Sequence, residues 1–197
     1  MRVLGIMGSP RIKGNTDLLL DEVLRGAQSQ EAEVEKIVVD RLKIAPCREY
    51  HGCLKEGNCV IRDDMDDIYP SLLTADVVIV ASPMFFYGLT SQVKALIDRC
   101  QALWARKYVL KNMPTDKVKK GAFIAVGATR GERLFEGPVL TVKYFFKAID
   151  VEYADELLIR GVDKRGEIKE HATALSDAFE LGKRLAISLT QIDFNVK

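Results

Sequence analysis

Residues 8–16 read GSPRIKGNT and bring together hydroxyl and amide side chains, an arginine and two glycines. Such groups donate hydrogen bonds, add positive charge and let a ligand approach the backbone. The stretch lies between the apolar run VLGIM and the helical pattern DLLLDEVLRGA, which indicates a strand-to-helix turn. A helix that begins near Asn15 or Thr16 presents unpaired N–H groups to a phosphate. Alternatively, Asn15 or Thr16 caps the helix and no ligand binds.

The spacing of the glycines excludes two common phosphate-binding motifs. A Walker loop has four residues between its glycines and then Lys-Ser or Lys-Thr. Here five residues separate Gly8 from Gly14, and Asn15 stands where the lysine would be. The dinucleotide pattern G-x-G-x-x-G does not occur in the sequence. The turn is therefore a candidate anion site of another kind.

Two further apolar runs lead into turns whose residues could bind a ligand. DVVIVA leads into SPMFFYG, which holds three adjacent aromatic residues. Exposed aromatic side chains are costly unless a flat ring, a partner subunit or the chain's own loops cover them. AFIAV leads into GATRGE, where glycines permit close backbone approach; a plain β-to-α turn is the alternative. Together the three turns describe a site for a phosphate-bearing flat ring.

The elements that position these turns alternate along the chain. Patterns typical of strands occupy residues 2–7, 33–40, 76–81, 122–126 and 153–159, and helical patterns occupy 16–27, 64–73, 91–104, 140–149 and about 167–189. Continuous apolar runs such as VVIVA are typical of strands buried on both faces of a parallel sheet. We therefore predict an α/β fold in three layers, with a flavodoxin-like, doubly wound, five-stranded parallel sheet in the order 2-1-3-4-5. Ligands bind at the carboxyl ends of such strands, where the three turns converge.

The bulk composition is that of an ordinary globular chain, and we expect residues 1–197 to form a single domain. The net charge of +1 does not indicate a surface that binds nucleic acid. No apolar stretch approaches the ~20 residues that span a membrane. Met1 leads almost directly into a strand, so we expect no signal peptide and a cytoplasmic location.

Three of the four cysteines fall in the segment CREYHGCLKEGNC. Residues from about 41 to 63 lack clear periodicity, and we expect a cysteine-bearing loop at the rim of the sheet. Clustered cysteines in a cytosolic chain more often form a metal or redox site than a disulfide framework. Cys100 lies in a helical pattern and is expected to be a buried small hydrophobe.

The stretches GSPRIKGNT, DDMDDIYPSLLTADVVIVASPMFFYGLTSQVKALIDR and VGATRG, in this order, resemble the NAD(P)H-dependent FMN reductase family, and above all its iron–sulfur flavoprotein branch. The resemblance extends to about residue 160 and implies non-covalently bound FMN. Carried over by position, the FMN phosphate would be bound by Ser9, Arg11, Gly14, Asn15 and Thr16. The ribityl chain and ring would be lined by Pro83, Met84, Phe85, Phe86, Tyr87 and Gly88. The other edge of the ring would be approached by Gly127, Thr129, Arg130 and Gly131.

The chain departs from this branch at the cysteines. Iron–sulfur flavoproteins carry C-x2-C-x2-C and a fourth cysteine, whereas Tyr50 stands here at the second position. A [4Fe–4S] cluster is held by four thiolates, and a phenol with a pKa of ~10 is a poor substitute. The neighbouring His51 offers an imidazole, which replaces thiolate in Rieske centres. Three outcomes stay open: no metal, a cluster with a non-cysteine ligand or an open iron, and another metal such as zinc. We assign no metal ligand.

The resemblance implies an enzyme, an FMN-dependent oxidoreductase that takes hydride from NAD(P)H and passes electrons to a flavin, a quinone or another small acceptor. The flavin carries the chemistry, so we name no side chain as general acid or base. The alternative is an electron-transfer iron–sulfur flavoprotein that accepts electrons from a protein donor such as ferredoxin, and a third is a non-enzymatic flavin-binding protein. The resemblance also implies a homodimer or homotetramer, and Trp104, Tyr108 and Leu110 are typical of interfaces.

Overall fold

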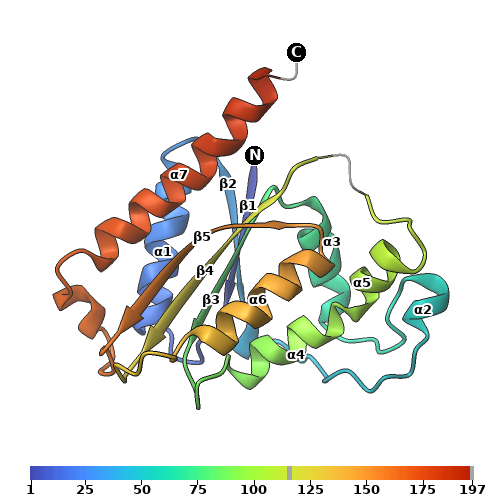
Figure 1. Ribbon diagram of the computed structural model, residues 1–197, viewed down its shortest axis with the longest axis horizontal. Helices are drawn as coiled ribbons and strands as arrows, with labels where there is room; N and C mark the ends of the chain where they lie inside the picture. The colour runs from blue at the N-terminus through green and yellow to red at the C-terminus, as the bar shows by residue number, and fades with distance from the viewer. Residues whose placement is uncertain (115–116, 196–197) are drawn as a thin grey trace.

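The computed structural model describes residues 1–114 and 117–195, and its centre is one parallel sheet (Figure 1). The strands are β1 (Arg2–Met7), β2 (Glu33–Val38), β3 (Val77–Pro83), β4 (Lys120–Gly127) and β5 (Glu152–Arg160). Their order is β2-β1-β3-β4-β5, and every neighbouring pair is parallel. The predicted fold class and strand order are confirmed.

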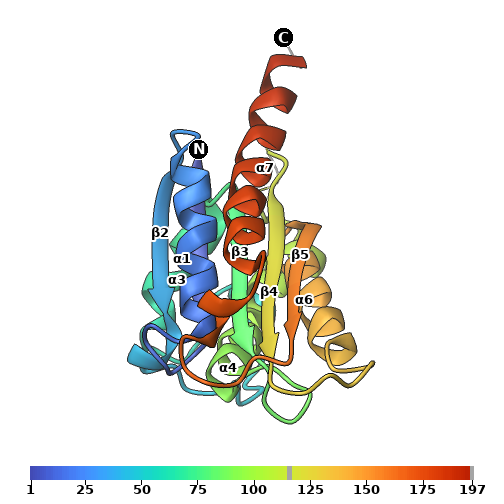
Figure 2. The ribbon, with the colours of Figure 1, turned by 90° about the vertical axis from the view of Figure 1, so that its left-hand side faces the viewer.

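Helices cover both faces of the sheet (Figures 1 and 2). One face carries α1 (Asn15–Gln28) and α7 (Ala174–Asn195), which lie side by side in front of the sheet in Figure 2. The other face carries α3 (Met65–Thr74), α4 (Ser91–Arg99), α5 (Gln101–Tyr108) and α6 (Glu136–Ala148). Three short elements complete the order: η1 (Val39–Arg41), α2 (Cys53–Glu56) and η2 (Glu167–Glu170).

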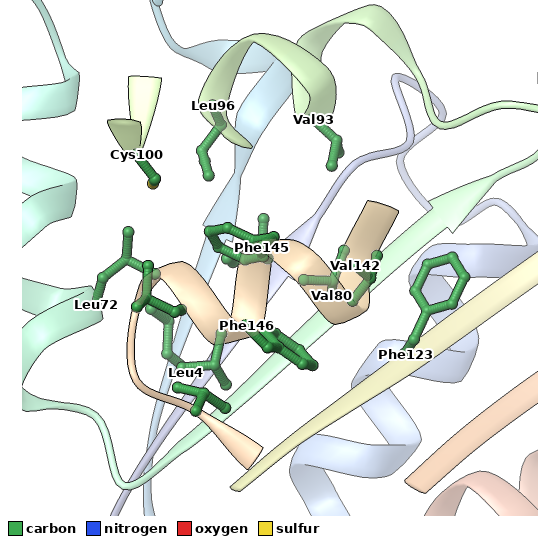
Figure 3. Close-up of a cluster of buried hydrophobic side chains, with 14 of the residues drawn as sticks. Leu4, Leu72, Val80, Val93, Leu96, Cys100, Phe123, Val142, Phe145 and Phe146 are labelled. Atoms are coloured by element: carbon green, nitrogen blue, oxygen red, sulfur yellow. The ribbon is translucent and has the colours of Figure 1, made fainter. Parts of the chain in front are cut away.

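Side chains of the central strands pack into two separate hydrophobic cores, one on each face of the sheet. In β3, Val78 and Val80 face the core under α3 to α6, while Val77, Ile79 and Ala81 face the core under α1 and α7. Because side chains alternate along a strand, a strand buried on both faces needs an unbroken apolar run. Figure 3 shows the first core, where Val80 lies with Phe145 and Phe146 of α6.

Two glycines let α1 and α7 approach backbone to backbone. A Cβ atom on Gly26 would lie 2.0 Å from the carbonyl oxygen of Phe179, and one on Gly182 would lie 1.9 Å from that of Val23. Real Cβ atoms do not come so close, so any larger residue there pushes the helices apart. The pair of glycines thus fixes the position of α7 on the sheet.

The predicted continuous helix over 91–104 is wrong, because the structure has α4 and α5 with Cys100 between them. The Tyr69 hydroxyl donates to the carbonyl oxygen of Arg99 at 2.9 Å. A tertiary contact thus takes an acceptor that a continuous helix would use, and the chain changes direction there. The predicted start of the next helix at residue 140 is also late: α6 begins at Glu136, with Pro138 in the first turn, where proline is tolerated.

Within the described ranges, the helices lack the combination of length and hydropathy that a membrane crossing demands.

Candidate functional site

The turn after β1 is anchored to the neighbouring strand and helix. The Gly8 amide donates to the carbonyl oxygen of Ala81 at 2.7 Å, and the Thr90 hydroxyl donates to the carbonyl oxygen of Gly8 at 2.8 Å. A Cβ atom on Gly8 would lie 2.1 Å from a methyl group of Val93, so only glycine fits. The buried Thr90 also caps α4, since its oxygen accepts from the Val93 amide at 3.4 Å. One hydroxyl therefore links the first two turns.

The first turn of α1 lacks a side-chain cap. The helix begins at Asn15, Gly14 is the N-cap residue, and among the described residues no side chain caps the helix. The alternative interpretation, in which Asn15 or Thr16 caps the helix, is therefore wrong. Asp17 instead accepts from the Lys13 amide at 2.6 Å, just before the helix. The first N–H groups of α1 remain free for an anion, and the helix dipole favours one there.

A hollow of about 100 Å³ lies at this helix end, between the turns that follow β1, β3, β4 and β5. Of the predicted site residues, it is lined by Ser9, Arg11, Gly14, Asn15, Thr16, Pro83, Met84 and Phe85. The side chains of Ser9 and Thr16 are almost fully buried at its wall. Ser9 Oγ accepts from the Arg11 amide at 3.1 Å, and the Thr16 hydroxyl makes no hydrogen bond within the described part of the chain. Both hydroxyls can donate to a ligand.

The aromatic loop after β3 forms a tight hairpin beside the hollow. Phe85 and Gly88 exchange two backbone hydrogen bonds of 3.0 and 2.9 Å. Phe86 and Tyr87 between them have φ values of 50° and 60°, and such left-handed backbone costs about 1–3 kcal/mol for each residue. Phe86 is fully exposed, and Phe85 is half exposed at the rim. Phe86, Tyr87 and Gly88 do not line the hollow, so their predicted contact with the ring stays a prediction.

The glycine-rich turn after β4 lies next to the hollow rather than in its wall. Val126 and Ala128 line the hollow, whereas Gly127, Thr129, Arg130 and Gly131 do not. A Cβ atom on Gly131 would lie 2.3 Å from the hydroxyl oxygen of Tyr87, so the second and third turns touch. The Arg130 guanidinium is exposed beside Gly161. The predicted role of these four residues at the ring's edge stays untested by the geometry.

The turn after β5 was not predicted from the sequence. Val162, Asp163 and Arg165 line the hollow, as does Pro10 in the first turn. Asn15 holds this turn in place: its amide nitrogen donates to the carbonyl oxygen of Lys164 at 2.9 Å, and its amide oxygen accepts from Ile168 N at 3.2 Å. The sequence did indicate this turn as part of the site, because the segment GVDKRG follows a predicted strand that ends at the same edge of the sheet.

Positive charge outweighs negative charge at the wall of the hollow. Arg11 and Arg165 line it together with one carboxylate, Asp163. The nearby buried Asp17 forms an ion pair with Lys36. Burial works to lower the pKa of Lys36, but hydrogen bonds to Asp17 and Asp21 raise it overall, so this lysine stays charged. The site therefore favours an anion.

A second hollow, of about 430 Å³, is lined by the cysteine-bearing segment. Cys47, Cys53 and Cys59 lie at its wall and are half-buried free thiols. Burial, followed by the charges of Cys59 and Cys47, raises the pKa of Cys53. The predicted burial of Cys100 is confirmed.

Comparisons with known proteins agree with this geometry. A sequence profile of the family described as NADPH-dependent FMN reductase matches residues 1–135, more than half of the chain. The chain belongs to this family. The family resemblance predicted from the three turns is confirmed, and the expected cofactor, FMN, is the flavin in the family's description.

Relatives of this family member include iron–sulfur flavoproteins and an FMN-containing oxidoreductase. An iron–sulfur flavoprotein from Methanocaldococcus jannaschii is 39% identical over 130 residues, which are 66% of this chain and 64% of the relative. The chain thus spans less than two thirds of the length of that relative. A Bacillus subtilis protein named as a putative NAD(P)H-dependent FMN-containing oxidoreductase is 26% identical over 188 residues, 93% of this chain and 98% of the relative.

The solved structure of an NAD(P)H:quinone oxidoreductase from Methanothermobacter marburgensis is similar in fold. It superposes with a TM-score of 0.69 at 16% sequence identity, over 94% of this chain and 96% of that one. At this identity the likeness supports the fold alone.

Proposed function

We propose that the chain is an FMN-dependent oxidoreductase that takes hydride from NADPH or NADH and passes electrons to a flavin, a quinone or another small acceptor. The observation that carries the proposal is one anion-binding hollow whose wall includes the apolar loop after β3, in a member of the NADPH-dependent FMN reductase family. When bound, FMN supplies the hydride and electron chemistry. The chain binds and orients it.

The residues of the first turn fit the phosphate of FMN. Ser9 and Thr16 offer hydroxyl donors, α1 offers its free N–H groups, and Arg11 and Arg165 offer charge. Gly14 keeps this turn tight, because a Cβ atom on it would lie 2.8 Å from the carbonyl oxygen of Arg11.

The loop after β3 fits the apolar part of the flavin. Met84 and Phe85 continue the wall of the hollow and remain partly exposed, so a ring that covers them removes apolar surface from water. Arg130, exposed on the adjoining turn, is the proposed contact for the phosphates of the nicotinamide nucleotide.

A pair of variants at Thr16 tests the phosphate site. Thr16→Val removes the hydroxyl and preserves the side chain's shape, whereas Thr16→Ser keeps the hydroxyl. We expect Thr16→Val to weaken FMN binding about tenfold, in line with ~1.5 kcal/mol for one hydrogen bond to a charged group, and Thr16→Ser to bind FMN nearly as the unmodified chain does. Fluorescence quenching of FMN measures both. Equal affinity of Thr16→Val and the unmodified chain would remove Thr16 from the site.

A second candidate function is electron transfer from a protein donor such as ferredoxin. Its support is the thiol-lined hollow and the relatives that are named iron–sulfur flavoproteins. The two candidates differ in one property: the reductase is reduced by NADPH or NADH alone, whereas the electron-transfer protein is reduced only by its protein donor.

We further propose that the chain is a cytoplasmic homodimer or homotetramer. Free thiols fit a reducing compartment. Large apolar side chains stand exposed on the loop after β3 and on α5 and α6, including Phe86, Tyr108 and Tyr144, and such residues are typical of interfaces. Light scattering should give a mass of at least twice the 22.0 kDa of one chain, and a mass of 22.0 kDa would reject an oligomer.

A further inference from the structure

The hollow beside α2, with a volume of about 430 Å³, has no part in the proposed function. The irregular segment 42–64 bends around it, and α2 lies against α5 (Figure 1). Asp98 and Gln101, at the end of α4 and the start of α5, form part of its wall. The flavin hollow lies at the opposite end of α4, near Thr90. The two hollows are thus separate sites.

Only three thiols can reach this hollow. The chain has four cysteines, and three of them line it. Cys100 does not, because its side chain is 1% exposed and lies in the core with Leu96 and Leu72 (Figure 3). Burial also raises the pKa of the Cys100 thiol far above its usual value, which opposes formation of the thiolate that a metal needs.

The remaining wall offers no fourth thiol. Tyr50 is 60% exposed, and its hydroxyl lies 3.5 Å from a guanidinium nitrogen of Arg48. Glu49 and His51 on either side are held in left-handed backbone, with φ values of 51° and 58°. Over residues 1–114 and 117–195, no group of three or more histidine, cysteine and carboxylate side chains is placed to hold a metal ion. A [4Fe–4S] cluster, which takes four thiolates, does not fit this set of donors.

A buried arginine organises the loop instead. The side chain of Arg99 is fully buried, and Nη1 donates to the carbonyl oxygen of Ala45 at 2.9 Å and to the Asp63 carboxylate at 2.6 Å. Nη2 donates to the carbonyl oxygen of Ile61 at 2.9 Å. Asp63 also accepts from the Ala45 amide at 2.9 Å. Arg99 therefore closes the cysteine segment by tying its two ends together.

The same guanidinium faces a thiol of the hollow. Burial works to lower the pKa of Arg99, but hydrogen bonds to Asp63 and Cys59 raise it overall. Arg99 Nε is fully buried and has no hydrogen-bond partner within the described residues. The loop around Cys59 is stabilised by the other guanidinium nitrogens, which donate to Asp63 and to two carbonyl oxygens.

We propose that this chain has lost the cluster ligand at residue 50 and keeps its cysteine loop folded around Arg99 instead of around iron and sulfide, with its three loop thiols free. Tyr50 lines the same hollow as the three cysteines, so Tyr50→Cys brings a fourth thiol to this hollow. The proposal concerns iron and thiols only and does not depend on the binding of FMN.

Anaerobic reconstitution with ferrous iron and sulfide tests the missing ligand. We expect the unmodified chain and Tyr50→Phe to retain less than about one iron per chain, and Tyr50→Cys to retain about four iron and four sulfide. Tyr50 is exposed, so neither variant disturbs the core. About four iron ions in the unmodified chain, or no gain of iron in Tyr50→Cys, would overturn the proposal.

Alkylation of native protein by iodoacetamide, read by mass spectrometry, tests the role of Arg99. In the unmodified chain, Cys47, Cys53 and Cys59 should react and Cys100 should not. Arg99→Met should speed the reaction of Cys59 about tenfold because the loop around it opens, with Arg99→Lys in between. Arg62→Met is the matched control, because Arg62 is an exposed arginine near the same loop, and it should leave the rate unchanged. An unchanged rate in Arg99→Met would contradict the proposed role of this residue.

Discussion

Thr90 connects two parts of the proposed flavin site through one buried hydroxyl. It donates to the carbonyl oxygen of Gly8 in the phosphate turn and accepts from Val93 at the start of α4. Nothing in the sequence LTSQVK shows the first contact, because the two residues are 82 positions apart. The capping role alone is readable from the residue type.

Thr90→Val should therefore affect both stability and ligand binding. The variant keeps the shape and removes both hydrogen bonds, so we expect a loss of about 1–3 kcal/mol in the free energy of unfolding, measured in urea. FMN should also bind more weakly, because the Gly8 turn loses an anchor. Thr90→Ser keeps the hydroxyl and should lie close to the unmodified chain; a valine variant of full stability would show that the hydroxyl does not anchor the turn.

Asp63 gives the stability a defined dependence on pH. Burial works to raise the pKa of this carboxyl, but hydrogen bonds from Arg99, Ala45 and Met65 lower it overall from its ordinary value of 3.8. A carboxyl with a depressed folded pKa contributes stability that is complete above the unfolded value and is lost as the pH falls through the folded one. The contribution should be full at neutral pH and decline below about pH 4.

Asp63→Asn separates this contribution from those of other carboxylates. The side chain is 11% exposed, and its loss leaves the Arg99 charge buried without its partner, so we expect a cost of about 3 kcal/mol at pH ~7. Unfolding in urea at a series of pH values should show the difference between the two proteins shrinking as the pH falls below about 4. A difference that stays constant down to about pH 2 would refute the depressed pKa.

At the scale of elements, the contact between α1 and α7 depends on glycine. Alanine is intrinsically better than glycine in a helix by about 1 kcal/mol, but a Cβ atom on Gly182 would lie 1.9 Å from the backbone oxygen of Val23. The clash outweighs the propensity, so Gly182→Ala should destabilise the protein by about 1–3 kcal/mol in thermal or urea unfolding. Gly137 is an exposed residue of α6, and a Cβ atom on it would lie 3.7 Å from its nearest neighbour, so Gly137→Ala should leave stability unchanged or raise it by up to ~1 kcal/mol. Equal behaviour of the two variants would contradict close packing of α7.

Elements that are buried on both faces could be predicted from the sequence, and those shaped by tertiary contacts could not. The central strands β1, β3 and β4 stand out as apolar runs, and their ends correctly pointed to the hollow. Edge strand β5 has only one buried residue, so the turn after it was overlooked. The break at Cys100 and the burial of Arg99 depend on Tyr69 and Asp63, which lie 30 and 36 positions from Arg99, and helical periodicity carries no trace of them.

At the scale of the whole molecule, α4 separates two sites of different chemistry. One end, capped by Thr90, adjoins the hollow proposed to bind an anion; the other, at Arg99, adjoins the thiol-lined hollow. Under the two proposals, the first hollow binds the FMN that carries the redox chemistry. The loop around the second hollow is held by Arg99 and contains no iron–sulfur cluster. Electrons then leave the protein from the flavin.

FMN-dependent oxidation of a nicotinamide nucleotide is tested most directly by the visible spectrum of the purified chain, recorded without air after FMN is added and excess flavin removed. NADPH and NADH are then added separately. We expect one FMN per chain and a flavin band that bleaches with at least one of the two nucleotides. A chain that retains no FMN, or a bound flavin that ignores both nucleotides, would contradict the proposed function.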